Sequence, residues 1–173
     1  MKLDTGKAYL VTGIAGSGKS TIKQSLVYLG YTAYDVDDGM AHWVNRATKV
    51  PTPYNPNLIP MTDNHDWLVN KTALLRAISS EDVVFICGSA HDLYRYEEYF
   101  TKMFLLQYPS EDAVRTRLLS RTSNSYGKDP KELESILGYW KEYEQKYIER
   151  NATVIDCTAP LVETVNKLIA ITK

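Results

Sequence analysis

The sequence is organised around residues 9–21, Tyr-Leu-Val-Thr-Gly-Ile-Ala-Gly-Ser-Gly-Lys-Ser-Thr. A short apolar run leads here directly into a glycine-rich segment, in which Gly13, Gly18, Lys19 and Ser20 complete the pattern G-x-x-x-x-G-K-[ST]. Glycines allow the backbone to curl around an anion, so that successive N–H groups point inward at the positive end of the following helix. The segment therefore predicts a binding site for nucleotide phosphates.

The chemistry of this segment gives its side chains separate roles. Lys19 supplies a full positive charge for the β- and γ-phosphates, and the Ser20 hydroxyl, in the first helical turn, is placed to ligate Mg²⁺. An ordinary Gly-Ser turn is disfavoured, because an apolar strand pattern precedes the segment and helical spacing of apolar residues follows it. The residues expected to contact the nucleotide here are Gly13, Ala15, Gly16, Ser17, Gly18, Lys19, Ser20 and Thr21.

Length and composition limit the possible partners. A chain of 173 residues is most simply one domain, which we expect to span 1–173. The net charge is −1, so nothing attracts the chain in bulk to nucleic acid or to an anionic membrane. No apolar run approaches the roughly 18 residues of a membrane span. We expect a cytoplasmic protein with a small-molecule partner, either as a monomer or as a homodimer.

Three carboxylates follow the next expected strand, at 31–34. In a parallel sheet the carboxyl ends of the strands face the ligand crevice, so Asp35, Asp37 and Asp38 lie at the same edge as the glycine-rich segment. Asp35 is placed to hold Mg²⁺ directly or through water, and Asp37 to orient and deprotonate an acceptor hydroxyl. The alternative is an N-cap for a helix beginning near Met40, which is favoured for Asp38.

The segment from about 38 to 70 is the least regular and is expected to be an insertion that binds the acceptor substrate. Residues 40–48 are predicted to form a helix, followed by a Pro-rich loop that closes over the acceptor. Trp43 and Arg46 are candidates to contact it, although a packed Trp and a surface Arg are equally compatible. Residues 67–78 are predicted to form the next helix.

Three basic residues of interest lie between positions 117 and 128. Arg117 and Arg121 are four residues apart and share a helical face, and both are expected to act on the transferring phosphate. The polar stretch at about 121–131, which includes Lys128, is suited to a lid whose cations cover the nucleotide, although a solvated basic loop is the alternative.

The apolar runs predict five strands, centred on Leu10, Ala33, Phe85, Leu105 and Ile155, each followed by helical sequence. Alternation of this kind implies an α/β fold, with a parallel sheet covered by helices on both faces. The strand around Phe85 does not end in the acid that many ATPases carry there, which assigns the metal-organising role to Asp35.

With these residues in place, the whole chain resembles the small P-loop kinases: shikimate kinases, gluconate kinases, nucleoside monophosphate kinases and a group of bacterial ATP-binding, AAA-family-like proteins. Tyr34-Asp35-Val36-Asp37 is similar to the aromatic-Asp-x-Asp stretch of shikimate kinases, and residues 87–90, Cys-Gly-Ser-Ala, are closer to gluconate kinases. The resemblance implies a P-loop NTPase three-layer sandwich with a five-stranded parallel sheet of order 2-3-1-4-5. It also implies ATP as the nucleotide.

Together these features predict an ATP- and Mg²⁺-dependent kinase that acts on a hydroxyl or phosphate of a small molecule. Its catalytic residues are expected to be Lys19, Asp37, Arg117 and Arg121, with Ser20 and Asp35 as metal ligands. Two alternatives remain open: a nucleotide-dependent switch that regulates a protein partner, and a resistance or toxin-type phosphotransferase that acts on an antibiotic or a macromolecule.

Overall fold

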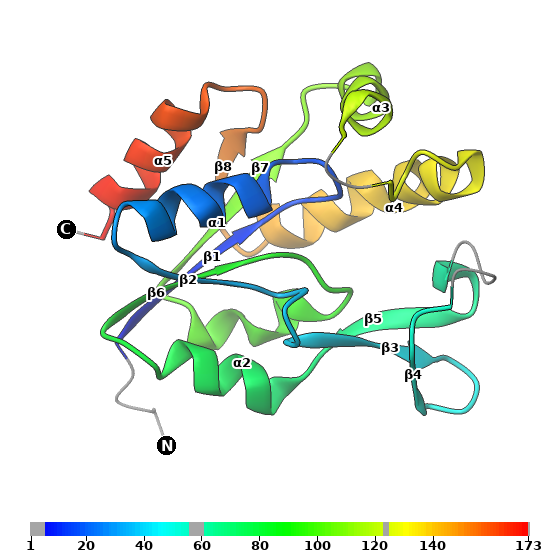
Figure 1. The fold of residues 1–173 in the computed structure, drawn as a ribbon, viewed down its shortest axis with the longest axis horizontal. Helices are drawn as coiled ribbons and strands as arrows, with labels where there is room; N and C mark the ends of the chain where they lie inside the picture. Colours follow the sequence, from blue (N-terminus) through cyan, green and yellow to red (C-terminus); the bar gives the residue numbers. More distant parts are fainter. Residues whose placement is uncertain (1–5, 56–60, 123–124, 173) are drawn as a thin grey trace.

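The central feature of the fold is a five-stranded parallel sheet (Figure 1). The structure, a computed structural model, describes residues 6–55, 61–122 and 125–172. The strands of this sheet are β1 (Lys7–Thr12), β2 (Thr32–Asp35), β6 (Val83–Cys87), β7 (Lys102–Gln107) and β8 (Thr153–Asp156). Their order is β2-β6-β1-β7-β8. Numbered along the chain within this sheet, this is the predicted order 2-3-1-4-5, which is confirmed.

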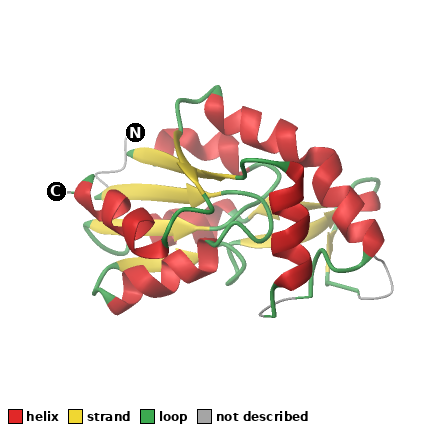
Figure 2. Ribbon diagram, turned by 90° about the horizontal axis from the view of Figure 1, so that it is seen from above, coloured by secondary structure: helices red, strands yellow, loops and turns green. Residues whose placement is uncertain are grey.

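Helices cover both faces of the sheet (Figures 1 and 2). The helices are α1 (Lys19–Tyr28), α2 (Lys71–Ile78), α3 (Glu111–Ser120), α4 (Pro130–Ile148) and α5 (Leu161–Ala170). In β1, Tyr9 and Val11 belong to the core beneath α1 and α5, while Ala8 and Leu10 belong to the core on the opposite face. Successive side chains of a strand point to opposite faces, so a continuous apolar run fills two cores at once. The predicted three-layer arrangement is confirmed.

A second, smaller sheet lies beside the first and was not predicted (Figure 1). It consists of β3 (Ala41–Asn45), β4 (Pro51–Thr52) and β5 (His65–Val69), which pair antiparallel in the order β4-β3-β5. A short 3₁₀ helix, η1 (Met61–Asp63), precedes β5. Pro51 lies on an edge strand, where its missing N–H breaks no ladder hydrogen bond.

The predicted helix at 40–48 is therefore wrong. The side chain of Asn45 accepts hydrogen bonds from the N–H groups of Ala47 and Thr48, which closes a tight turn after β3. Across the sheet, Trp43 pairs with Trp67, and their ring centroids are 5.2 Å apart. Local side-chain hydrogen bonding and cross-strand aromatic packing thus override the weak helical pattern.

The predicted helix at 67–78 is correct only in its second half. Residues up to Val69 form β5, and Asn70 then caps α2 by accepting a hydrogen bond from the N–H of Ala73 at 3.1 Å. Asp38 does not cap a helix at Met40, since none begins there; its carboxylate lies 3.6 Å from the ammonium of Lys23.

Hydrogen bonds attach the small sheet to the rest of the domain. His91 N–H donates to the carbonyl of Trp67 at 2.8 Å, and Val69 N–H donates to a carboxylate oxygen of Asp92 at 2.9 Å. At the far end, the hydroxyls of Thr62 and Ser135 are 2.8 Å apart, which links the segment before β5 to α4. The small sheet is thereby fixed against the carboxyl edge of the large one. No helix among the described residues is long and apolar enough to cross a membrane.

Candidate active site

A cavity of about 940 Å³ opens beyond the carboxyl ends of the large sheet, between the glycine-rich loop, the small sheet and helices α3 and α4. We call the side formed by residues 14–21, Arg117 and Arg121 the loop wall. We call the side formed by Trp43, Trp67, His91, Tyr139 and Tyr143 the aromatic wall. Asp35 and Asp37 line the same cavity. A volume of this size is sufficient for a nucleotide together with a second small molecule.

The loop wall has the geometry of an anion cradle. Gly18, immediately before α1, has φ of 99°, and a Cβ built there would meet only an Arg117 nitrogen, at 4.0 Å. Only glycine adopts this conformation without strain, and the open space on its inner side is where a phosphate can approach the backbone. Lys19 follows, and its ammonium donates to the carbonyl of Ile14 at 2.8 Å.

Burial strongly affects Lys19. Removal from water lowers the pKa of its ammonium to about 8, although the charges of Asp37 and Asp35 oppose this shift. An ammonium held in a partly dry site interacts more strongly with an added anion than one in bulk water. The position of Lys19 is thus suited to a phosphate that supplies the missing negative charge.

Ser20 and Asp35 meet directly. The Ser20 hydroxyl donates to a carboxylate oxygen of Asp35 at 2.9 Å, and the other oxygen of Asp35 accepts the N–H of Asp37 at 3.1 Å. Mg²⁺ at phosphate-transfer sites takes one or two protein oxygens and completes its shell with phosphate oxygens and water. A hydroxyl and a carboxylate side by side next to the loop fit this requirement. No group of three His, Cys, Asp or Glu residues within the described ranges could hold a metal.

Asp37 lies between the two walls. Burial and the neighbouring charge of Asp35 raise the pKa of its carboxyl, whereas the charge of Lys19 and the nearby side chain of Trp67 lower it. Asp37 lies close both to Trp67 of the aromatic wall and to Lys19 of the loop wall. Asp37 therefore lies where a ligand bound at the loop wall would meet a second ligand bound at the aromatic wall.

Helix α3 brings two arginines to the loop wall. Arg117 donates through Nε to the carbonyl of Gly16 at 3.3 Å, and Arg121 donates to the carbonyl of Tyr126. The Nε of Arg121 is buried and has no hydrogen-bond partner among the described residues. Both side chains line the cavity.

The lid expected at 121–131 is only partly described, since residues 123 and 124 lie outside the described ranges. Thr122, Ser125 and Tyr126 line the cavity. Lys128 is exposed and is not among the residues that line the cavity, so its contact with the nucleotide stays a prediction. Gly13 and Ser17 are buried within the loop and support its shape from behind.

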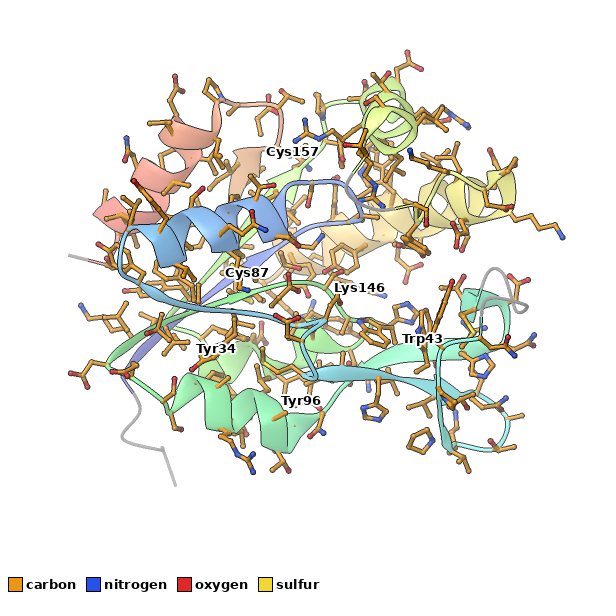
Figure 3. The ribbon with its side chains drawn as sticks, viewed as in Figure 1. Tyr34, Trp43, Cys87, Tyr96, Lys146 and Cys157 are labelled. Carbon is orange, nitrogen blue, oxygen red and sulfur yellow. The ribbon has the colours of Figure 1, made fainter. Side chains whose placement is uncertain are left out.

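The aromatic wall joins the small sheet to α4. The ring centroids of Trp43 and His91 are 6.5 Å apart, those of His91 and Tyr139 are 6.4 Å apart, and those of Tyr139 and Tyr143 are 6.5 Å apart. Figure 3 shows Trp43 between the small sheet and α4. The wall is thus a continuous series of rings rather than a set of separate side chains.

Arg46 does not belong to this wall. Its guanidinium donates to the carboxylate of Asp66 at 2.9 Å and to the carbonyls of Asp63 and Thr62 at 3.0 and 2.6 Å. Asp66 also lies 3.3 Å from Nδ1 of His91. Arg46 lines a smaller cavity of about 400 Å³ on the other side of His91, and of the two candidates in this segment only Trp43 reaches the main cavity.

The structure brings together most of the residues that the sequence singled out. The predicted residues that line the main cavity are Ala15, Gly16, Gly18, Lys19, Ser20, Thr21, Asp35, Asp37, Arg117 and Arg121. Sequence reasoning missed Trp67, His91 and Tyr139 as cavity residues. Trp67 falls in the segment predicted as a helix, and no motif in the sequence points to Tyr139. The only signal for His91 was its position shortly after the glycine that ends β6.

Comparisons with solved structures identify the fold. The chain is similar to a gluconokinase from Sinorhizobium meliloti 1021, with 19% identity, a TM-score of 0.60, and 97% of this chain and 92% of that chain covered. It is similar to a shikimate kinase from Bacteroides thetaiotaomicron, with 13% identity, a TM-score of 0.60, and 95% and 97% covered. It is also similar to a sugar kinase from Janibacter sp. HTCC2649, with 17% identity, a TM-score of 0.57, and 95% of this chain and 93% of that chain covered.

No protein-family model and no curated protein sequence matches the chain. The chain has the fold of the small P-loop kinases, and the likeness extends over nearly its whole length. At these identities the likeness concerns the fold.

Proposed function

We propose that the chain is an ATP- and Mg²⁺-dependent phosphotransferase that acts on a small molecule. The observation that carries the proposal is the single cavity in which Lys19, the Ser20–Asp35 pair and Asp37 stand in sequence from the loop wall toward the aromatic wall. Phosphate transfer needs positive charge at the phosphates and a carboxylate at the attacking oxygen, and this cavity presents both.

In the proposed reaction the loop amides and Lys19 bind the β- and γ-phosphates of ATP. Ser20 and Asp35 would hold Mg²⁺, which when bound neutralises charge on the phosphate oxygens. Asp37 orients the acceptor hydroxyl and takes its proton as the oxygen forms a bond to the γ-phosphorus. The bond from the γ-phosphorus to the β-phosphate oxygen breaks, and ADP leaves. Arg117 and Arg121 stabilise the charge on the phosphoryl group in transit.

The protonation states in the cavity agree with these roles. Burial raises the pKa of the Asp37 carboxyl from a low ordinary value, so the group becomes a better proton acceptor than an exposed aspartate. Burial lowers the pKa of Lys19 to about 8, which leaves the ammonium largely charged at neutral pH. The gluconokinase, shikimate kinase and sugar kinase folds noted above lend the proposal further support.

The first test is ADP release from Mg·ATP, alone and with a panel of nucleosides, nucleoside monophosphates, sugars, sugar acids and shikimate. We expect one class of acceptor to stimulate the release. Release that is slow and indifferent to every acceptor would contradict a small-molecule phosphotransferase and favour a switch or a macromolecular target.

A second test uses Asp37→Asn. Loss of the proton acceptor should lower kcat by about 10²- to 10⁴-fold and leave the affinity for ATP within about twofold, as measured by nucleotide titration. Asp38→Asn is the matched control, because Asp38 pairs with Lys23 and does not line the cavity. Normal turnover by Asp37→Asn would remove Asp37 from the mechanism.

A further inference from the structure

The acceptor side of the cavity is built from flat side chains. Trp43 comes from β3, Trp67 from β5, and Tyr139 and Tyr143 from α4. Aromatic side chains present broad apolar faces, and a flat ring of a ligand can pack on such faces in an offset-stacked or edge-to-face arrangement. The cross-strand pairing of Trp43 with Trp67 and the contact of Trp43 with His91 hold these rings in fixed positions.

The aromatic wall lies on the side of the hydroxyl that would be phosphorylated. Trp67 and Asp37 line the same cavity, and the Trp67 side chain is close enough to the Asp37 carboxylate to favour its charged form. The wall therefore adjoins the proposed proton acceptor, whereas Thr21 and Gln24 bring α1, which follows the phosphate loop, to the cavity. A ring stacked on the wall belongs to the acceptor and not to the nucleotide that occupies the loop.

The positive charges of the cavity are all on the loop wall. Within the described ranges, the Lys and Arg side chains that line the cavity are Lys19, Arg117 and Arg121. Arg46, the nearest candidate on the small sheet, already donates to Asp66 and to two backbone carbonyls and faces a different cavity. Residues 56–60, Pro-Asn-Leu-Ile-Pro, contribute no cation by sequence.

The remaining charges would repel an anionic acceptor. Asp35, Asp37 and Glu132 all line the cavity. His91 cannot compensate, since burial lowers the pKa of its imidazole, against the opposing effect of Asp66, and leaves the ring neutral at pH 7. A carboxylate or phosphate on the acceptor would have to approach these acids without a cation of its own.

We propose that the acceptor is an uncharged alcohol that carries a flat aromatic or heteroaromatic ring, with the ring against Trp43 and Trp67 and the hydroxyl at Asp37. Nucleosides are the simplest probes of this chemistry. The inference rests on the proposed phosphotransfer, and it assigns the aromatic wall as the site that selects the acceptor. Thr62, which hydrogen-bonds to Ser135 on α4, also lines this part of the cavity and offers a hydroxyl to the acceptor's polar groups.

The test uses two independent measurements on the whole chain. Binding is followed by quenching of intrinsic tryptophan fluorescence in the absence of ATP, and transfer is followed by ADP release. The probes are the four ribonucleosides, their 5′-monophosphates, gluconate and shikimate. We expect nucleosides to quench the fluorescence and to stimulate ADP release, and gluconate and shikimate to do neither.

Substitutions of Trp43 test whether acceptor binding depends on the aromatic wall. Trp43→Leu should raise the KM for the acceptor by about 10-fold or more and leave the KM for ATP within about twofold, since loss of one stacking ring removes binding without touching the loop. Trp43→Phe keeps a ring and should recover most of the acceptor affinity, which separates stacking from misfolding. Tyr28→Leu is the control, because Tyr28 is 90% exposed on α1.

The outcomes distinguish this proposal from the one on which it rests. Stimulation that is stronger with gluconate, shikimate or a monophosphate than with every uncharged ring compound would overturn the acceptor class and leave phosphotransfer standing. If no acceptor stimulates ADP release, phosphotransfer to small molecules fails. The fluorescence titration then tests the aromatic wall as a binding site on its own. Quenching by nucleosides supports binding of a ring at this wall, and absence of quenching overturns it.

Discussion

The loop wall and the aromatic wall of the cavity are built from different kinds of interaction. The loop wall is shaped by backbone: a buried strand, β1, leads into glycines with positive φ, and the N–H groups of α1 complete the cradle. The aromatic wall is shaped by side chains, through ring contacts and through the hydrogen bonds of Arg46, Asp66 and His91.

This difference separates two tasks. Backbone geometry offers the same donors whatever the side chains are, which suits a constant ligand such as a phosphate chain. Side chains that line a cavity can differ while the fold stays the same, so they suit a ligand that varies from one function to another. Substitutions in the loop wall should therefore change catalysis, and substitutions in the aromatic wall should change the choice of acceptor.

The largest expected effect tests the loop wall. Lys19→Ala removes the charge at the β- and γ-phosphates and should lower kcat/KM for ATP by about 10³-fold, measured by ADP release with a saturating acceptor. Thermal stability should change little, because burial already disfavours this ammonium. Lys23→Ala, which removes only the ion pair with Asp38, is the matched control. An effect confined to the acceptor KM would contradict the division between the walls.

The next effect concerns how the backbone fixes the acids. A Cβ on Gly88, where φ is 154°, would lie 2.3 Å from Cβ of Val36, between Asp35 and Asp37. Gly88→Ala should therefore destabilise the protein by about 1–3 kcal/mol in urea unfolding and also lower kcat, because the acids shift.

Gly138→Ala on α4 provides the opposite case, since a Cβ there meets nothing within 4 Å. It should stabilise the protein by about 0.5–1 kcal/mol through its helix propensity. Equal unfolding free energies and equal kcat values for Gly88→Ala and Gly138→Ala would mean that the close approach of Gly88 to Val36 does not hold the acids in place.

The two regions also differ in how far the sequence predicted them. Continuous apolar runs rich in β-branched and aromatic residues, such as those around Leu10, Phe85 and Leu105, are typical of strands covered on both faces, and the spacing of Gly13, Gly18 and Lys19 predicts the loop between β1 and α1. The five-stranded sheet and the loop wall were predicted for these physical reasons.

The small sheet could not be predicted in the same way. Its strands are half-buried, and β3 owes its conformation to the partner ring of Trp67, more than 20 residues away, and to the turn at Asn45. Neither leaves a periodic signal in a stretch interrupted by prolines. Tyr139 could not be singled out either, because α4 passes from the core into the cavity without a change of residue type.

A third prediction uses pH to separate the walls. The free enzyme should lose affinity for ATP above about pH 8, where Lys19 loses its proton, so kcat/KM for ATP should fall about 10-fold per pH unit beyond that point. The KM for the acceptor should not change over this alkaline part of the pH profile, which we call the alkaline limb. Lys19→Arg keeps its charge at higher pH and should lack the limb even if its activity is lower. A limb that persists in Lys19→Arg would assign the titration to another group.

The smallest effect concerns the stability of the aromatic wall. Burial lowers the pKa of His91 in the folded state, so between that pKa and the ordinary value of 6.5 the unfolded chain binds more protons than the folded one. Stability should therefore fall as pH decreases below about 6.5. Asp66, whose pKa Arg46 and His91 hold below its ordinary value although burial opposes them, stays ionised in this window and adds nothing to the slope.

His91→Gln can keep a hydrogen bond to Asp66 but cannot titrate. Urea midpoints at pH 7.5 and 5.5 should differ less in this variant than in the wild type, with little change at pH 7.5 itself. His42→Gln, on β3 of the small sheet, controls for loss of a histidine as such. If His91→Gln leaves the pH dependence intact, the imidazole is not buried by the aromatic wall as the ring contacts indicate. If His91→Gln loses both the pH dependence of the urea midpoint and the preference for one class of acceptor, the neutral ring of His91 contributes to the stability of the aromatic wall and to its selectivity.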